Sequence, residues 1–426
     1  MLACFRLFLY GITIIGPCQS EGVVIQYQGY EANEVWEMTV CDTLRTWCEI
    51  DLDAMLHNFT AARRHLPDEV LLAAVIKANA YGHGAVEAAK LLEGKADRFA
   101  VAMTDEAVEL RKAGIETPIF LLAPTPESDF EAIARYDIEA AVPSFAYGKA
   151  LCAYGAAHGK AIPYHIALDT GMGRIGFACT EQSLDEIEAL TKLPGGKLLG
   201  VFSHYAKADC ADKTYANEQT RRYKAMTAAL EKRGIAIPLK HLDNSAGLIE
   251  MPEKFDMVRE GIILYGLKPS DEVDLSLIGG VKGVMALKSH ISFLKTVTEP
   301  TPVSYGCTCV AQPGTKVATV SAGYADGVNR LLSNRGQVLV RGVRCPILGR
   351  VCMDQFMIDV TKVPEAKVGD TVTIFGRDGG DEITADDVAD LIGTIGYEVT
   401  CLITPRVPRV YIRDGEIVSV QRPLMD

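Results

Sequence analysis

Short apolar strands alternate with helical patterns eight times in the first two thirds of this 426-residue chain, and this alternation is the feature that most restricts its fold. The expected strands are Leu72–Lys77, Arg98–Met103, Pro118–Leu122, Ala140–Pro143, Tyr164–Asp169, Leu199–His204, Lys240–Asp243 and Met257–Leu264. Eight strand–helix units over about 220 residues are typical of a (β/α)8 barrel, so the sequence predicts an α/β fold with an N-terminal TIM-type barrel. A doubly wound parallel sheet is the alternative, but it does not require eight units.

The pattern changes after Ala286, where short β-rich runs are separated by Gly, Pro and Asp. The runs include Val317–Val320, Val338–Val343, Ile347–Val351, Met357–Val360 and Thr371–Phe375. One helix is expected among them, at Ala385–Ile392, with Thr384 as its N-cap. The sequence therefore predicts an N-terminal extension at 1–42, a barrel at 43–285 and a mostly-β C-terminal domain at 286–426.

The first 42 residues fit neither domain. The apolar run from Leu7 to Ile15 is too short to span a bilayer, and no clean small-residue cleavage site follows it. It is either a weak signal-like segment of an exported protein or an extension ahead of a true start near Met38 in a cytoplasmic one. We favour the extension.

Charge and cysteine content restrict the partners. The net charge of -12 argues against nucleic acid as a partner, and no membrane partner is expected. The twelve cysteines are dispersed, with none in a CxxC pair, which indicates reduced thiols of a cytosolic enzyme and no metal site.

Lys77 stands at the end of the first expected strand, in the stretch AVIKANAYGHG (residues 74–84). A buried ammonium is costly as structure, whereas a partly desolvated amine has a lowered pKa and can form a Schiff base with a carbonyl. A lysine that extends to solvent is the alternative. Other polar residues fall at the same ends of later strands: the loop 169–174, His204, Asn244, Ser245 and Arg259. Because a barrel gathers its active site at the carboxyl ends of its strands, this register favours a catalytic site.

Nine motifs carry a family resemblance. They are AVIKANAYGHG (74–84), DTGMGRIG (169–176), SHYA (203–206), DNSAG (243–247), VREGIILYG (258–266), VSYG (303–306), GYADG (323–327), GRVCMDQFMID (349–359) and YEVTCLITPRVPR (397–409). With these motifs in order, the chain from about Thr46 to about Val418 resembles the alanine racemase family. The resemblance implies a barrel with a β domain, pyridoxal 5'-phosphate as cofactor, and a head-to-tail homodimer with shared active sites. It also implies interconversion of L-alanine and D-alanine, which supplies D-alanine for peptidoglycan.

The resemblance implies a two-base mechanism. Lys77 holds the cofactor as an internal aldimine and, once released, acts as one acid–base group, while Tyr305 of the partner subunit is the other. A phenol with a pKa near 10 is a poor base at neutral pH, and the resemblance implies that His204 and Arg259 lower that pKa through a chain of contacts. Arg259 is also implied to face the pyridine nitrogen. A guanidinium donates hydrogen bonds and accepts no proton, which is consistent with an unprotonated ring.

Further contacts are implied by the same resemblance. Cofactor contacts are assigned to Lys77, Tyr81, Arg174, His204, Asn244, Ser245, Arg259, Gly261, Ile262 and Tyr397. Substrate contacts are assigned to Arg174, Met353, Tyr305, Asp354 and Tyr324. The sequence departs from the family at Ala167, where many members carry a carbamylated lysine that supports the arginine matched by Arg174. Arg174 therefore needs another support, such as a chloride ion or a neighbouring side chain.

Three other functions compete with this interpretation. A serine or broad-specificity racemase would share the motifs, since one methylene or hydroxyl changes discrimination by only about 1–3 kcal/mol. A non-catalytic pyridoxal phosphate carrier would lack the β domain. A decarboxylase of related architecture would need an acid where Arg259 stands.

Overall fold

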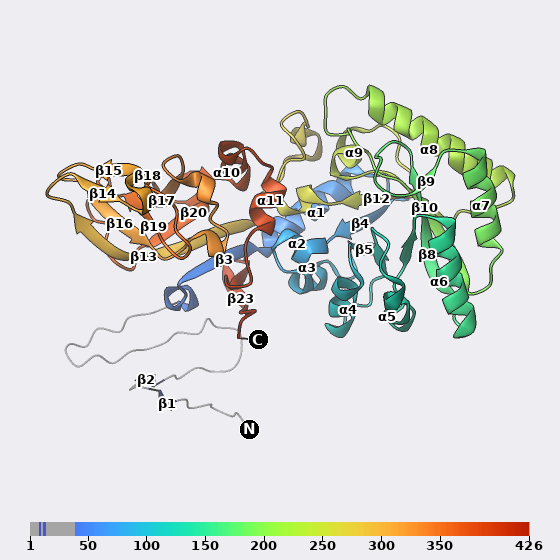
Figure 1. Cartoon of the computed structure of the whole chain (residues 1–426), viewed down its shortest axis with the longest axis horizontal. Helices are drawn as coiled ribbons and strands as arrows, with labels where there is room; N and C mark the ends of the chain where they lie inside the picture. The colour runs from blue at the N-terminus through green and yellow to red at the C-terminus, as the bar shows by residue number, and fades with distance from the viewer. Residues whose placement is uncertain (1–7, 10–11, 14–38, 426) are drawn as a thin grey trace. The chain divides into compact units, whose positions relative to one another are not determined.

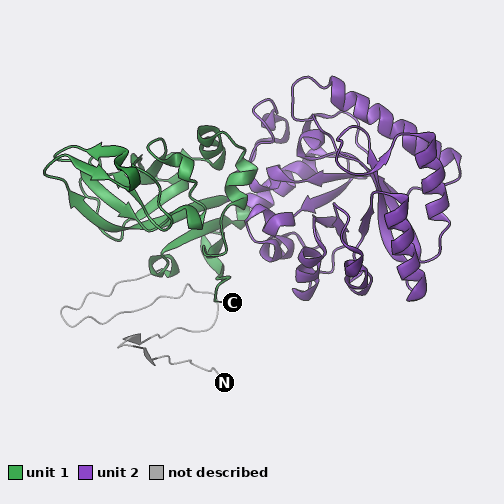
Figure 2. Ribbon diagram, in the orientation of Figure 1, with its two compact units in different colours: residues 1–53, 285–426 green, residues 54–284 purple. Residues whose placement is uncertain are grey.

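The structure is a computed structural model and describes residues 8–9, 12–13 and 39–425. It forms two compact units, one of residues 54–284 and one that combines the described residues up to Asp53 with those from Met285 onward (Figure 2). The predicted N-terminal extension lies mostly outside the described residues. Within it, the short strands β1 (Phe8–Leu9) and β2 (Ile12–Thr13) pair antiparallel.

Eight parallel strands form a closed ring in the first unit (Figure 1). They are β4 (Leu71–Val75), β5 (Arg98–Val101), β6 (Ile119–Leu121), β7 (Ala140–Val142), β8 (Ile162–Asp169), β10 (Gly196–Phe202), β11 (Leu239–His241) and β12 (Met257–Glu260). β12 pairs with β4, and backbone hydrogen bonds from Leu121 N to Glu139 O (2.9 Å) and from Glu139 N to Ile119 O (2.8 Å) join β6 to β7. The predicted (β/α)8 barrel is therefore confirmed, because a doubly wound sheet would leave two open edges.

Helices cover the outside of this ring (Figure 1). They are α1 (Leu52–His65), α3 (Ala85–Leu92), α4 (Thr104–Lys112), α5 (Phe130–Arg135), α6 (Phe145–Ala157), α7 (Glu181–Thr191) and α8 (Thr214–Lys232). The short segments α2 (Lys77–Tyr81) and α9 (Ser245–Glu250) follow the carboxyl ends of β4 and β11, and the φ angles within α2 are not those of an α-helix. Local capping starts several of the outer helices: the side chains of Ser144 and Thr180 accept hydrogen bonds from the backbone at the first turns of α6 and α7. A two-residue strand, β9 (Phe177–Ala178), pairs with the end of β8.

The second unit contains a largely antiparallel sheet in the order β21-β20-β17-β18-β19-β16-β13-β3-β22-β23. An additional pairing of β20 with β13 closes six of these strands into a ring. Its strands are β3 (Thr46–Asp51), β13 (Met285–Thr296), β16 (Lys316–Val320), β17 (Gln337–Val340), β18 (Val343–Leu348), β19 (Phe356–Asp359), β20 (Thr371–Asp378), β21 (Asp381–Ile383), β22 (Arg409–Arg413) and β23 (Glu416–Gln421). A separate hairpin, β14 (Thr301–Val303) with β15 (Cys309–Ala311), and the helices α10 (Ala385–Ile392) and α11 (Gly396–Cys401) complete the unit. The mostly-β C-terminal domain is thus confirmed.

Three expected elements differ from the structure. The strand expected at Met257–Leu264 ends at Glu260, because Gly261 has ψ of -103° and the chain then enters the 3-10 turn η3 (Ile262–Tyr265). The run Val338–Val343 is split by a hairpin turn at Arg341 and Gly342, which both have positive φ. β3 belongs to the sheet of the second unit, where it pairs with β13 and β22, although the sequence groups residues 43–53 with the barrel.

Candidate active site

The loop after β4 carries Lys77 and has an unusual backbone. The φ angles of residues 78–81 lie between 51° and 53°, so the chain makes one turn of left-handed helix, with a hydrogen bond from Gly82 N to Ala78 O (3.0 Å). This conformation costs about 1–2 kcal/mol for each non-glycine residue. Contacts outside the turn must therefore stabilise it. The turn leaves Lys77 half-buried at the carboxyl end of β4.

Arg259 on β12 lies inside the ring of strands and is only 3% exposed. Its guanidinium donates hydrogen bonds to the carbonyl oxygens of Ser203 (2.8 Å) and Leu242 (2.9 Å). It also contacts Nδ1 of His241 (2.9 Å) and Nδ1 of His204 (3.2 Å). Burial lowers the pKa of Arg259 to about 10, so the group stays cationic at neutral pH.

A chain of buried side chains continues from Arg259 across the barrel. His241 Nε2 lies 3.0 Å from His165 Nδ1, and His165 Nε2 lies 3.0 Å from Oε2 of Glu139, which also pairs with Arg98 (2.9 Å). A guanidinium has only donors, so Nδ1 of His241 must accept; each imidazole then carries its proton on Nε2 and donates it toward Glu139. Burial lowers the pKa of both histidines, which is consistent with neutral rings. Although burial acts to raise the pKa of Glu139, the hydrogen bond from His165 and the charge of Arg98 lower it overall.

His204 follows β10 at the carboxyl ends of the strands, and its Nδ1 contacts the guanidinium of Arg259. Burial first, and then the charges of Arg259, Arg174 and Lys77, lower the pKa of His204 well below its usual value. The loops that carry Lys77 and Arg174 follow β4 and β8, so these residues, like His204 after β10, lie at the carboxyl ends of the strands. Nδ1 of His204 accepts from Arg259, and the ring proton is therefore on Nε2.

The loop that carries Arg174 is organised by the end of β8. Asp169 Oδ1 accepts hydrogen bonds from the N–H groups of Gly171 (2.9 Å) and Gly173 (3.0 Å). Arg174 itself is exposed, while Ala167, two residues before Asp169, is buried in the strand. The loop thus presents a guanidinium to solvent at the same end of the barrel as Lys77.

A cluster of hydroxyl and backbone donors lies beside Gly261. Ser245 Oγ accepts from Gly261 N–H (2.9 Å), and Asn244 caps α9 by accepting from Gly247 N–H (3.0 Å). A Cβ placed on Gly261 would lie 3.3 Å from the Tyr81 hydroxyl and 3.5 Å from Ser245 Oγ. Two hydroxyls therefore face the space that a side chain at Gly261 would fill, next to the N-terminus of η3 at Ile262. Such a donor set suits a phosphate dianion.

The other predicted site residues lie in the second unit. They are Tyr305 at the tip of the β14–β15 hairpin, Tyr324 in the 3-10 turn η6 (Tyr324–Asp326), Met353 and Asp354 in the loop before β19, and Tyr397 on α11. The side chains of Tyr305, Met353 and Tyr324 are 71%, 52% and 42% exposed, which is high for large apolar groups. They are accessible to a molecule that approaches this unit.

Backbone contacts tie the loops of these exposed residues together. Tyr324 N–H donates to Cys352 O (3.0 Å), and Ala325 N–H donates to Met353 O (3.0 Å). Ser304 Oγ, which precedes Tyr305, donates to Arg350 O (2.6 Å). The tips of three separate loops are therefore held as one surface.

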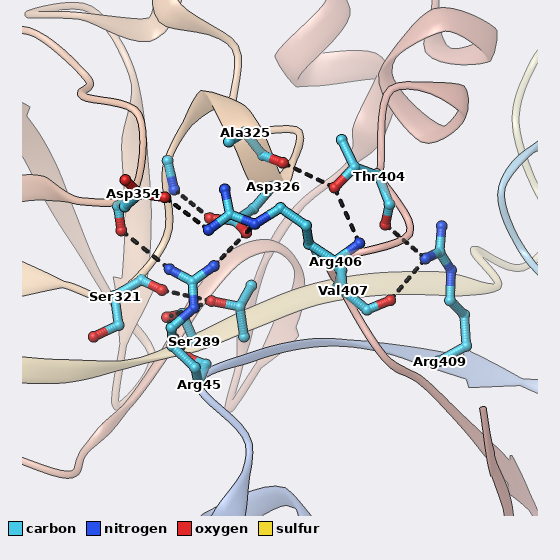
Figure 3. A network of polar contacts seen from close by, with 12 residues as sticks. Arg45, Ser289, Ser321, Ala325, Asp326, Asp354, Thr404, Arg406, Val407 and Arg409 are labelled. Carbon is cyan, nitrogen blue, oxygen red and sulfur yellow. Dashed lines mark hydrogen bonds and ion pairs between the residues drawn. The ribbon is translucent and has the colours of Figure 1, made fainter. Parts of the chain in front are cut away.

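Ion pairs also connect the loops that carry these exposed residues (Figure 3). Asp326 is fully buried; it accepts from Gly323 N–H (2.9 Å) and forms an ion pair with Arg45. Arg406 lies 2.7 Å from a carboxylate oxygen of Asp354 and 3.7 Å from one of Asp326. A single arginine thus joins the loops of Tyr324 and Met353.

Several residues that make these contacts in the two units are absent from the predicted set. Glu139, His165 and His241 form the buried chain behind Arg259, and Asp326 and Arg406 fix the exposed loops. The three barrel residues are titratable groups within or next to apolar strands, and this was the sequence signal that could have identified them.

The first unit is a closed parallel barrel with a lysine, two arginines and hydroxyl donors at the carboxyl ends of its strands, and the chain continues into a β domain. These features define a class of barrel enzymes with a β domain. Comparison with models of known families identifies the family within this class. The model of the N-terminal domain of alanine racemase matches residues 50–269, and that of the C-terminal domain matches residues 284–411. The chain belongs to the alanine racemase family.

Individual relatives agree with this assignment. The chain is 46% identical over 381 residues to alanine racemase 2 of Caldanaerobacter subterraneus subsp. tengcongensis, covering 89% of this chain and 98% of that one. It is 44% identical over 378 residues to alanine racemase 1 of Clostridium acetobutylicum, covering 88% and 97%. The crystal structure of alanine racemase from Bacillus anthracis with bound L-Ala-P superposes with a TM-score of 0.85 at 38% identity, covering 90% of this chain and 98% of that one. An alanine racemase structure from Clostridium difficile gives a TM-score of 0.86 at 40% identity, covering 89% and 99%.

Within the described part of the chain, no helix has both the length and the apolar character needed to cross a bilayer. Among residues 39–425, no group of three or more histidine, cysteine or acidic side chains is arranged to hold a metal ion.

Proposed function

We propose that this protein interconverts L-alanine and D-alanine with pyridoxal 5'-phosphate as cofactor, and that the D-alanine serves peptidoglycan synthesis in the cytoplasm. The observation that carries the proposal is the set of polar groups at the carboxyl ends of the barrel strands: Lys77 follows β4, Arg259 on β12 contacts His204 (3.2 Å), and the Tyr81 and Ser245 hydroxyls face Gly261. The relatives at 44–46% identity are alanine racemases, which favours alanine over serine as the substrate.

The residues of the first unit fit the cofactor. The Tyr81 and Ser245 hydroxyls and the backbone N–H of Ile262 form a cradle for its phosphate; the Gly261 N–H orients the Ser245 hydroxyl by donating to its oxygen (2.9 Å), and Tyr397 is a further expected contact. Arg259 offers a donor to the pyridine nitrogen, because its contacts fix the guanidinium inside the barrel. When bound, the cofactor supplies an electron-accepting ring conjugated with the substrate nitrogen, which acidifies the Cα–H bond.

Two residues move the protons. In one direction the Lys77 amine removes the Cα proton from one face of the substrate and Tyr305 of the partner subunit delivers a proton to the other face, so the configuration at Cα inverts. In the reverse direction the two residues exchange these roles. His204 carries its proton on Nε2 and donates it toward the Tyr305 oxygen, which favours the phenolate and makes the phenol a usable base. Arg174 and the backbone N–H of the partner subunit's Met353 bind the substrate carboxylate; Asp354 orients this loop and Tyr324 narrows the entrance.

The active form we propose is a head-to-tail homodimer with shared sites. In the second unit, three large side chains, Tyr305, Tyr324 and Met353, are exposed on loops held together by hydrogen bonds. Rigid exposed apolar groups of this kind are typical of a surface that a partner covers. Each subunit would then complete the site of the other.

Substitution of the lysine tests the reaction and the cofactor together. Wild-type protein should show the visible absorbance of bound pyridoxal phosphate and should drive the circular dichroism of L-alanine to zero, and Lys77→Ala should do neither. The control is Lys90→Ala, which removes an exposed lysine of α3 that pairs only with Glu87 among the described residues. A Lys77→Ala protein that still racemises alanine would exclude this mechanism.

Mixing two inactive variants tests the shared sites. Lys77→Ala and Tyr305→Phe chains, denatured and refolded together at equal amounts, should recover about a quarter of wild-type activity, because half of the dimers are hybrids with one complete site each. Each variant alone should stay inactive. If the mixture recovers no activity although hybrids form, the sites are not shared between subunits.

A further inference from the structure

Glu106 contacts the lysine loop from a neighbouring helix. It lies in the first turn of α4, and its Oε1 accepts a hydrogen bond from the N–H of Ala78 (2.6 Å), the residue directly after Lys77. Ala78 is also the first residue of the left-handed turn. The contact joins segments that are 28 residues apart in the sequence.

The second carboxylate oxygen of Glu106, Oε2, caps the N-terminus of α4. It accepts from the N–H groups of Ala102 (2.8 Å) and Met103 (3.2 Å), which lie just before α4. This is the usual role of a glutamate three residues into a helix. Capping therefore occupies one carboxylate oxygen and leaves Oε1 for Ala78.

We propose that Glu106 is a positioning residue that anchors the left-handed turn and so fixes where the Lys77 amine stands. A turn of four non-glycine residues at positive φ persists only when its surroundings hold it, and the Ala78 N–H is the point at which α4 reaches it. On the other side, Asn79 Oδ1 accepts from Ala85 N–H (2.9 Å) at the start of α3. The turn is thus held by both flanking helices. The proposal rests on the proposed function, in which the Lys77 amine captures the cofactor aldehyde.

The chemistry of the amide group makes Glu106→Gln selective. Glutamine has one acceptor oxygen and one NH2 donor, so it cannot accept from both sets of N–H groups. The oxygen should turn toward Ala102 and Met103, where it makes two bonds, and the NH2 then faces the Ala78 N–H. Glu106→Gln should therefore keep the hydrogen bonds from Ala102 and Met103 that cap α4 and lose the hydrogen bond from Ala78 N–H.

Hydrogen exchange of the cofactor-free full chain measures this loss. We expect the Ala78 amide to exchange about five-fold faster in Glu106→Gln, while the amides of Ala102 and Met103 keep their wild-type rates. Glu106→Asp is the second variant: it keeps the charge, and its shorter side chain can cap α4 but does not reach Ala78. Glu106→Asp should accelerate exchange of the Ala78 amide as much as Glu106→Gln does. This result would show that the length of the side chain, and not its charge, protects that amide.

Cofactor capture measures the consequence for the amine. Both variants should bind added pyridoxal phosphate about five-fold more slowly than the wild type, followed by absorbance. The matched control is Asp387→Asn, which alters the same kind of cap on α10, where Asp387 Oδ2 accepts from Thr384 N–H (2.8 Å). The control should change neither the Ala78 exchange rate nor capture.

Three results would overturn the proposal: wild-type Ala78 exchange in both Glu106 variants, faster exchange with unchanged capture, or an equal effect of Asp387→Asn. If the wild type captures no cofactor, the proposed function fails, and the exchange rates alone decide whether Glu106 anchors the turn.

Discussion

Gly323 offers a direct test of whether the loop of Met353 contributes to substrate binding. Gly323 precedes Tyr324, and a Cβ built on it would lie 2.3 Å from Met353 O and 2.4 Å from Cys352 O. Its φ of -157° is extended backbone, which any residue adopts. Gly323→Ala therefore introduces a steric conflict without backbone strain at the substituted residue.

The size of the conflict follows from these distances. A carbon and a carbonyl oxygen need about 3.2 Å, so the loop of Met353 must move away by about 0.9 Å. Neither atom can rotate aside, because both belong to the backbone. The shift also lengthens the hydrogen bonds from Tyr324 N to Cys352 O and from Ala325 N to Met353 O, both 3.0 Å. A misplacement of about 1 Å in a substrate-positioning group can lower the rate about 100-fold.

Steady-state racemisation with purified variants is the assay. We expect kcat/KM for L-alanine to fall about 100-fold in Gly323→Ala, while the absorbance of bound cofactor stays unchanged, because the Tyr81 and Ser245 hydroxyls of the cradle belong to the first unit. Gly380→Ala is the control, since a Cβ there meets no atom within 4 Å and its φ is not positive. If Gly323→Ala keeps kcat/KM within two-fold of the wild type, the Met353 loop does not position the substrate.

Three further predictions follow from the barrel. Glu139→Gln removes the charge that pairs with Arg98 and accepts from His165, so the free energy of unfolding in urea should fall by about 3 kcal/mol; an unchanged value would contradict the importance of the buried pair. Burial raises the pKa of Asp243 from 3.8 to about 6, so the protonated side chain stabilises the fold fully below pH 4, and this stabilisation is lost as the pH rises through 6. Asp243→Asn should therefore have a free energy of unfolding about 2 kcal/mol higher than the wild type at pH 7 and no higher at pH 4, as measured by urea unfolding at both pH values. Ser245→Ala leaves Gly261 N–H without its acceptor, and equilibrium dialysis should show about ten-fold weaker binding of pyridoxal phosphate, whereas equal affinity would exclude the hydroxyl from the cradle.

The sequence by itself determined the elements whose signals are local. Helix α10 begins and ends as predicted, at Ala385–Ile392, because its N-cap Thr384 and its C-cap Gly393 stand next to it in the chain. The eight-fold alternation predicted the barrel, and the position of Lys77 at the end of the first strand predicted a site there. These features depend on periodicity and on residues a few positions apart, which a sequence displays directly.

Only the tertiary structure decided which distant groups meet. β3 pairs with β13 and β22, which lie more than 230 and 350 residues further along the chain. The Glu139–His165–His241 chain comes from three separate parts of the barrel, and the contact of Glu106 with Ala78 joins a helix cap to a strained turn. Strand pairing and side-chain contacts of this kind depend on packing among residues far apart in sequence, for which local patterns contain no signal.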